Sequence, residues 1–129
     1  TPETQNLLRL IDDAKANGDL APNFIDELKV VSNECAMNPE LYAAMQKELQ
    51  RRGVKFSIDD GCATFQRSEF HGFYSYDFSL KVPLDGSAAT GSDSVRTGSS
   101  TERKAEELDK DIAAKVIFAP PKRTSIFID

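Results

Sequence analysis

The sequence predicts an α+β protein in which a layer of short helices packs on an antiparallel β-meander. Up to Gly53, apolar residues recur three and four positions apart, which is the spacing of amphipathic helices. From Val54 onward they alternate with polar residues, which is the spacing of strands with one covered face. The length of 129 residues suits a single domain that builds its core without metals or disulfides.

Residues 1–53 form the helical part and contain start and stop signals for three helices. Thr1-Pro2-Glu3 and Asn38-Pro39-Glu40 each place a capping side chain before a proline, which fits the first helical position. Another helix is expected to start near Pro22-Asn23. Gly18 and Gly53 end the first and third helices, because glycine tolerates the left-handed conformation of a helix terminus. The expected apolar stripes are Leu7, Leu8, Ile11 and Ala14; Phe24, Leu28, Val31 and Cys35; and Leu41, Met45 and Leu49, with Tyr42 beside the last.

Residues 54–84 are predicted to form three strands joined by short turns, and therefore an antiparallel sheet. Val54, Phe56 and Ile58 mark the first strand, and Asp59-Asp60-Gly61 is a turn sequence. The second strand runs from Cys62 to about Gln66, and a turn is expected at residues 69–72. In the third strand we expect the even-numbered residues to face the helices: Tyr74, Tyr76, Phe78, Leu80 and Val82.

The remaining residues divide into a flexible polar loop at 85–100 and a final part at 101–129. The loop is too poor in apolar residues to offset the entropy of ordering it. A fourth helix is expected from Thr101 to about Val116, with a stripe of Ala105, Leu108, Ile112 and Val116. After two prolines, the apolar run Ser125, Ile126, Phe127 and Ile128 is either a last strand or a docking tail for a partner.

The residue inventory argues against several kinds of chemistry. The two cysteines, Cys35 and Cys62, and the single histidine, His71, cannot supply the four ligands of a structural zinc site. The sequence contains no G-x-S-x-G motif and no glycine-rich phosphate-binding loop. Asp59-Asp60-Gly61 lacks the alternating oxygen ligands of an EF-hand, so a turn is the better interpretation. We therefore expect no catalytic residues, no metal site and no cofactor.

Charge and hydropathy describe a soluble, acidic chain. The formal net charge is −5, which argues against non-specific binding to nucleic acid. No apolar run approaches the length that crosses a membrane, so we expect no membrane insertion. Two isolated cysteines are typical of free thiols in a reducing, intracellular compartment. Removal of a methionine before Thr1 and cleavage of a longer targeting segment both explain the first residue, and the sequence does not separate them.

Three functions remain, and we favour a non-catalytic protein-interaction or assembly protein, such as an accessory subunit or small regulator. Its partner is another protein, a larger assembly or a second copy, and Ser125, Ile126, Phe127 and Ile128 are the candidate contacts. The alternative is a small-ligand-binding protein or enzyme with an aromatic pocket between helices and sheet, lined by Tyr42, Tyr74, Tyr76 and Phe78. The third is a regulator of nucleic-acid machinery, which would need Lys55, Arg67 and Lys81 to cluster on the wet face of the sheet.

Overall fold

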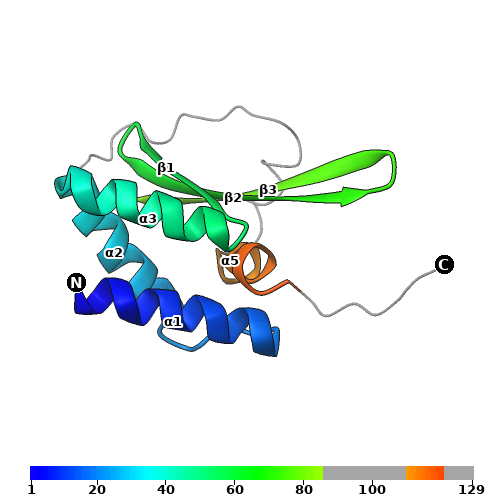
Figure 1. Cartoon of the computed structure of the whole chain (residues 1–129), viewed down its shortest axis with the longest axis horizontal. Helices are drawn as coiled ribbons and strands as arrows, with labels where there is room; N and C mark the ends of the chain where they lie inside the picture. Colours follow the sequence, from blue (N-terminus) through cyan, green and yellow to red (C-terminus); the bar gives the residue numbers. More distant parts are fainter. Residues whose placement is uncertain (86–109, 121–129) are drawn as a thin grey trace.

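The computed structural model describes residues 1–85 and 110–120, and it confirms the predicted α+β fold class (Figure 1). Three helices precede a three-stranded antiparallel sheet, and a further helix follows it. The elements are α1 (Pro2–Asn17), α2 (Phe24–Met37), α3 (Pro39–Arg51), β1 (Lys55–Asp59), β2 (Cys62–His71), β3 (Tyr74–Pro83) and α5 (Lys110–Phe118). None of the helices within these residues is long and apolar enough to cross a bilayer.

The helix ends lie where the sequence predicts them. The Thr1 hydroxyl accepts a hydrogen bond from the backbone N–H of Thr4 at 3.2 Å and caps α1. Asn38 Oδ1 accepts from the N–H groups of Glu40 and Leu41 at 3.1 and 3.2 Å and caps α3. Gly18 ends α1 with φ of 79°, a conformation that costs glycine little because it has no Cβ. Local capping chemistry thus sets the boundaries of these helices.

The sheet has the strand order β1-β2-β3, and its side-chain alternation defines one buried face. Phe56 lies opposite Phe65, and Phe65 lies opposite Leu80, so one row of apolar side chains crosses all three strands. The Phe56 and Phe65 rings stack with centroids 4.8 Å apart. The turn between β1 and β2 has Asp60 and Gly61 at positive φ, as the Asp-Asp-Gly sequence predicts.

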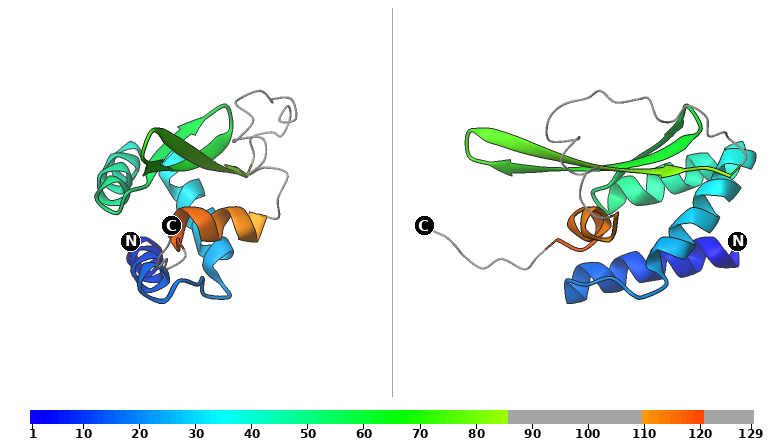
Figure 2. Two further views of the ribbon diagram at one scale, coloured as in Figure 1. Left: turned by 90° about the vertical axis from the view of Figure 1, so that its right-hand side faces the viewer. Right: turned by 180° about the vertical axis from the view of Figure 1, so that it is seen from behind.

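The helices pack below this apolar face. Figure 2 shows α5 between the sheet and α1, with α3 along the β1 side. The Phe118 ring of α5 contacts Phe24 of α2 and Phe65 of β2, with centroids 5.1 and 5.5 Å apart. The buried residues predicted for α2, which are Phe24, Leu28, Val31 and Cys35, all belong to this core. Residues far apart in the sequence therefore share one hydrophobic core.

The second strand is longer than the sequence predicted, and the turn expected at residues 69–72 was placed too early. β2 continues to His71, and its pairing with β3 is unbroken as far as His71 opposite Tyr74. The reversal falls at Gly72 and Phe73, where Gly72 has φ of 68°. Residues 67–71 do not alternate in polarity, because most of this stretch does not lie over the core, and the strand signal was therefore weak.

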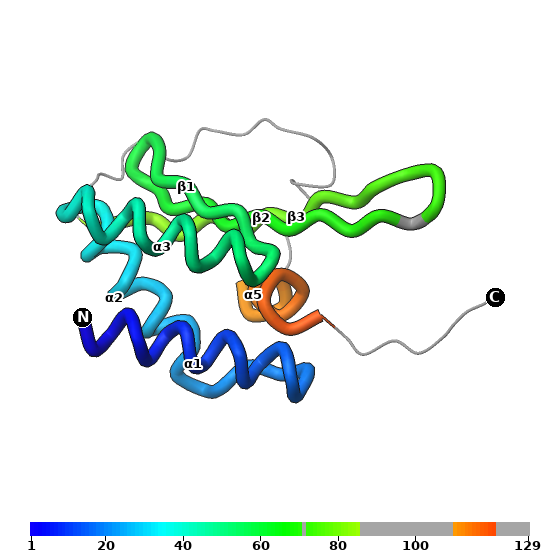
Figure 3. Tube along the Cα trace, in the orientation of Figure 1, coloured from blue at the N-terminus to red at the C-terminus, as the bar shows by residue number. Residues whose placement is uncertain are grey.

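The expected burial of the third strand holds for only half of its length. Leu80 and Val82 are buried and Phe78 is partly buried, but Tyr74 and Tyr76 are 58% and 45% exposed. The paired strands extend beyond the helices, as the tube in Figure 3 shows. Tyr74 and Tyr76 therefore lie on the face that was predicted, but none of the described helices covers them.

The buried face of the last helix also differs from the prediction. Ala113, Ala114, Ile117 and Phe118 are buried, whereas Ile112 is exposed and Val116 is only partly buried. Two alanines on the inner side allow α5 to approach the core closely and place Phe118 between α2 and β2. The predicted loop from 86 to 100, the predicted helix start at 101–109 and the run Ser125–Ile128 lie outside the described residues.

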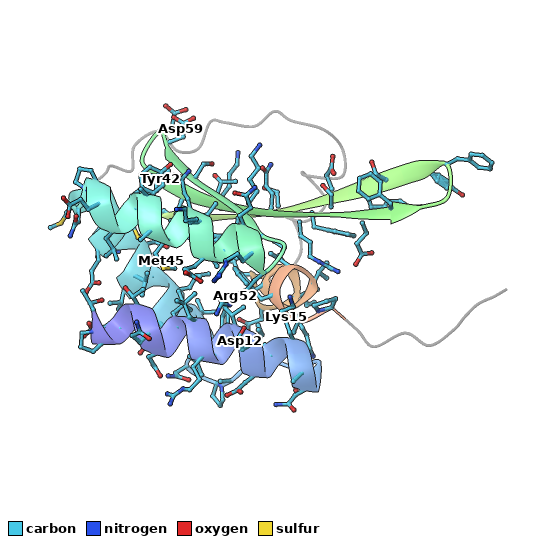
Figure 4. All side chains as sticks on the ribbon, viewed as in Figure 1. Asp12, Lys15, Tyr42, Met45, Arg52 and Asp59 are labelled. Atoms are coloured by element: carbon cyan, nitrogen blue, oxygen red, sulfur yellow. The ribbon has the colours of Figure 1, made fainter. Side chains whose placement is uncertain are left out.

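An ion-pair cluster joins α1 to the end of α3 (Figure 4). The Arg52 guanidinium donates to both carboxylate oxygens of Asp12, at 2.9 and 3.1 Å, and to Glu48 Oε1 at 3.1 Å. Lys15 Nζ donates to the Arg52 carbonyl oxygen at 3.1 Å. The hydrogen bond from Arg52 is the main reason why the pKa of Asp12 lies below its ordinary value, against a smaller opposing effect of burial.

We expect Asp12→Asn to lower the free energy of unfolding at neutral pH by at most about 1 kcal/mol, because Asp12 is more than half exposed. A carboxyl whose folded pKa is depressed stabilises the protein above its unfolded pKa, which is near 4. That contribution disappears as the pH falls through the lower, folded pKa. Urea unfolding from pH 7 down to pH 3 should therefore show the difference between wild type and variant shrinking below about pH 4. A constant difference, or an equal effect of the neighbouring exposed Asp13→Asn, would contradict the assignment.

Candidate functional site

The main surface feature is the end of the β2–β3 hairpin, which we define as residues 67–78 and call the hairpin end. β1 pairs with β2 only as far as Lys55 opposite Gln66. Beyond that point, within the described residues, β2 and β3 pair only with each other. Figure 1 shows this two-stranded arm projecting past α3 and α5.

Four large aromatic side chains are exposed on the hairpin end. Phe70 is 81% exposed, and Phe73 at the turn is fully exposed. Tyr74 and Tyr76 contact each other with ring centroids 5.9 Å apart. Strand alternation places these tyrosines on the helix-side face and Phe70 on the opposite, open face. The arm therefore presents aromatic surface on both faces and at its turn.

Arg67 attaches the base of the hairpin end to the helical layer. Its Nη1 donates to the carbonyl oxygen of Val116 in α5 at 3.2 Å and to Glu69 Oε2 at 2.6 Å. Arg67 thus lies on the helix-side face, because it alternates with Gln66 and Ser68 of the open face. The sequence suggested that Lys55, Arg67 and Lys81 cluster on the wet face of the sheet. This prediction is wrong, because only the two lysines lie on that face.

The aromatic residues predicted to line one pocket lie at opposite ends of the sheet. The Tyr42 hydroxyl accepts from the backbone N–H of Ile58 at 2.9 Å, and its ring packs edge-on against Phe56. Ile58 pairs with Ala63, whereas Tyr76 pairs with Glu69, six residues further along β2. At about 3.3 Å per residue this separation is roughly 20 Å. Tyr42 therefore does not meet Tyr74 and Tyr76 in one site, and ligand binding by these residues stays a prediction.

A cavity of about 740 Å³ lies instead on the open face, between the end of α3 and the start of the hairpin end. Its lining includes the amides of Gln46, Gln50 and Gln66 and the ammonium of Lys55. The Gln46 amide donates to the carbonyl oxygen of Phe56 at 3.0 Å. Its remaining polar groups include Ser57 and the hydrogen-bonded pair Ser68 and Asp77, whose side-chain oxygens are 2.7 Å apart. Val54 and Phe56 also belong to the lining, so the cavity combines hydrogen-bonding groups with apolar surface.

The described residues contain no group of three or more His, Cys, Asp or Glu side chains that could hold a metal ion. Cys35 and Cys62 are both free thiols. Burial, assisted by the charge of Glu34, raises the pKa of Cys35 to about 11. The Cys35 thiol therefore stays protonated at neutral pH, which is a poor state for a nucleophile.

Comparison with known proteins does not assign this surface. No family model, no curated protein and no solved structure matches the chain.

Sequence reasoning missed Phe70 and Phe73 because both were assigned to, or lay beside, a turn. The available signal was the stretch Phe70-His71-Gly72-Phe73-Tyr74, which carries aromatic residues on both sides of a glycine turn. With a two-residue turn, directly opposite residues have opposite parity, so Phe70 and Tyr74 point to opposite faces of the hairpin. They cannot all belong to a core that covers one face.

Proposed function

We propose that this chain is a non-catalytic protein-interaction protein that binds a partner protein through the hairpin end. The observation that carries the proposal is the exposure of Phe70, Phe73, Tyr74 and Tyr76 on an arm that projects beyond the helices. Exposed large apolar side chains gathered on one arm are typical of interaction sites.

The energetics favour a partner that covers these side chains. Burying a large apolar side chain is worth about 1.5–3 kcal/mol, so even two of the four supply a substantial part of a binding energy. Phenylalanine and tyrosine are enriched in protein interfaces, and tyrosine is common among the residues that dominate binding. Because these side chains have only two torsion angles, fixing them in an interface costs little conformational entropy.

The hairpin end is held in place before binding. The β2–β3 register has no interruption, and Arg67 fixes the base of the arm to α5. The Ser68 hydroxyl and the Asp77 carboxylate join the two strands on the open face. Such preorganisation lowers the entropic cost of association.

The alternative function, binding of a small polar ligand, is supported by the cavity beside Lys55. It has less support than the hairpin end, because the aromatic residues predicted to line a ligand pocket do not line this cavity. Regulation of nucleic-acid machinery has less support again, since Arg67 is already bonded to Glu69 and Val116 on the other face.

Affinity purification of the tagged full chain from its native cells tests the proposal. We expect the double variant Phe70→Ser/Phe73→Ser to recover at least about tenfold less partner than wild type, because it removes two exposed anchors. The melting temperature should stay within about 2 °C, since neither side chain is buried.

The matched control is Val30→Ser/Met37→Ser, which removes two exposed apolar residues from α2. It should recover as much partner as wild type. Undiminished recovery with the hairpin variant, or equal loss with the α2 variant, would overturn the proposal.

A further inference from the structure

One edge of β2 is open along the hairpin end. β1 ends its pairing at Gln66, so Arg67–His71 pair with β3 on one side and with no described strand on the other. These five residues span about 17 Å at 3.3–3.4 Å per residue. The open edge is therefore as long as β1, which also has five residues.

This edge has ordinary strand geometry, without a bulge or a proline to prevent pairing. In an antiparallel sheet the N–H and C=O groups of every second residue point to the same edge, so part of this backbone has no ladder partner. The register shows no bulge, and the segment contains no proline. Its two charged side chains, Arg67 and Glu69, are already paired with each other. The edge therefore lacks two of the devices that protect edge strands, a bulge and a proline.

The cavity lined by Lys55 lies at the inner end of this edge, where β1 begins. The exposed side chain of Lys55 lines this cavity. Its ammonium group makes no ion pair or hydrogen bond within the described residues. The side chains of Gln50, Ser57 and Gln66 likewise have no hydrogen-bond partner there. The cavity therefore offers one free cation and several free amide and hydroxyl groups beside an open strand edge.

We propose that the edge Arg67–His71 binds an extended segment of the partner protein as an added strand, in line with β1. The proposal rests on the proposed function and names the kind of partner. Added strands obtain affinity from main-chain hydrogen bonds and specificity from alternate side chains. The free carboxylate of an aspartate or glutamate is the group that complements Lys55.

Strand geometry fixes where that acid must be. A residue opposite Ser68 has its side chain on the open face, about 7 Å along the strand from the Lys55 position. Asp77 lies two strands away from that added residue, at about 10 Å, and its carboxylate accepts a hydrogen bond from the Ser68 hydroxyl. The next open-face residue of the added strand, two positions on, lies beside exposed Phe70. The expected segment therefore carries an acid and a large apolar residue two positions apart.

A second copy of this chain fits the edge less well. If two such edges paired antiparallel along all five residues, Glu69 of one copy would lie directly opposite Glu69 of the other. Like charges directly opposite each other destabilise a sheet. The same register would also drive the turn at Gly72 and Phe73 against Lys55, which occupies the position opposite Gln66.

The test is a selection of random nine-residue peptides, displayed between flexible flanks, on the immobilised full chain. The strongest peptide is then synthesised and titrated into the isotope-labelled chain while amide NMR signals are followed. We expect an acid two positions from an aromatic or aliphatic residue, with the largest shifts at residues 66–71 and at Lys55. Methylating alternate backbone nitrogens of the peptide should abolish binding, since it removes main-chain donors.

Charge reversal provides the matched control. Lys55→Glu should weaken the selected peptide about fivefold or more, and a peptide with lysine in place of its acid should bind this variant better than it binds wild type. Lys29→Glu, an exposed lysine on α2, should leave binding unchanged.

Three results would overturn the inference: no peptide is enriched, the shifts map away from β2, or N-methylation is harmless. Concentration-dependent dimerisation through residues 67–71 would assign the edge to a second copy and would also overturn it. The proposed function can survive these results, because it is tested separately. If the native partner is lost with Phe70→Ser/Phe73→Ser but retained with Lys55→Glu and uncompeted by the selected peptide, the hairpin end binds by another mode.

Discussion

Phe65→Ala should lower the free energy of unfolding by about 3–5 kcal/mol, the range for truncating a buried phenylalanine. Phe65 is central to the core, because it stacks on Phe56 within the sheet and contacts Phe118 of α5 from below. Its removal leaves a cavity that rigid neighbours on two layers cannot easily fill. Chemical denaturation monitored by circular dichroism measures the change.

Phe73→Ala is the matched control, since the same residue type is fully exposed at the hairpin turn. Its effect should stay within about 0.5 kcal/mol. Similar losses for Phe65→Ala and Phe73→Ala would mean that the hairpin end is packed and that the assignment of the covered face is wrong.

Phe118→Ala should have a comparable effect, about 3–4 kcal/mol, because this ring joins α5 to both α2 and the sheet. The contact with Phe24 gives the prediction a second part. In a double-mutant cycle, Phe24→Ala and Phe118→Ala should couple by about 0.5–1.5 kcal/mol, as aromatic pairs do. Additive effects, or a Phe118→Ala variant as stable as wild type, would show that α5 does not share the core.

The sequence was sufficient for most of the architecture because local signals and burial agree there. Thr1, Gly18 and Asn38 cap helices by their own chemistry, independently of the rest of the fold. The stripe Phe24, Leu28, Val31 and Cys35 is buried as a unit. The change of period after Gly53 marks the start of the sheet, since helix and strand place side chains with different repeats.

The periodicity of the sequence shows which face of a strand or helix is apolar. It does not show whether another element covers that face, and the burial predictions failed for this reason. Tyr74 and Tyr76 continue the apolar face of β3, yet the helices end before they reach these residues. α5 has apolar residues on two neighbouring faces, one with Ile112 and Val116 and one with Ala113 and Ile117. Tertiary packing determines that the second face is buried. How far the helical layer extends over the sheet depends on tertiary packing and not on local sequence.

The candidate site was less accessible to sequence reasoning than the fold. A charged, mixed stretch from Arg67 to His71 hides a strand, because alternation is lost where both faces meet solvent. The open edge depends on where β1 ends, and the cavity depends on how α3 lies against the sheet. An interaction protein was nevertheless the favoured hypothesis, and the hairpin end gives that hypothesis specific residues to test.

Hydrogen–deuterium exchange on the purified native complex, compared with the free chain, tests the central claim most directly. We expect slower amide exchange at residues 67–78 in the complex, while α1 and α2 exchange at the same rate in both samples. Unchanged exchange across the hairpin, together with protection of a helical surface, would contradict the assignment of this arm as the binding surface.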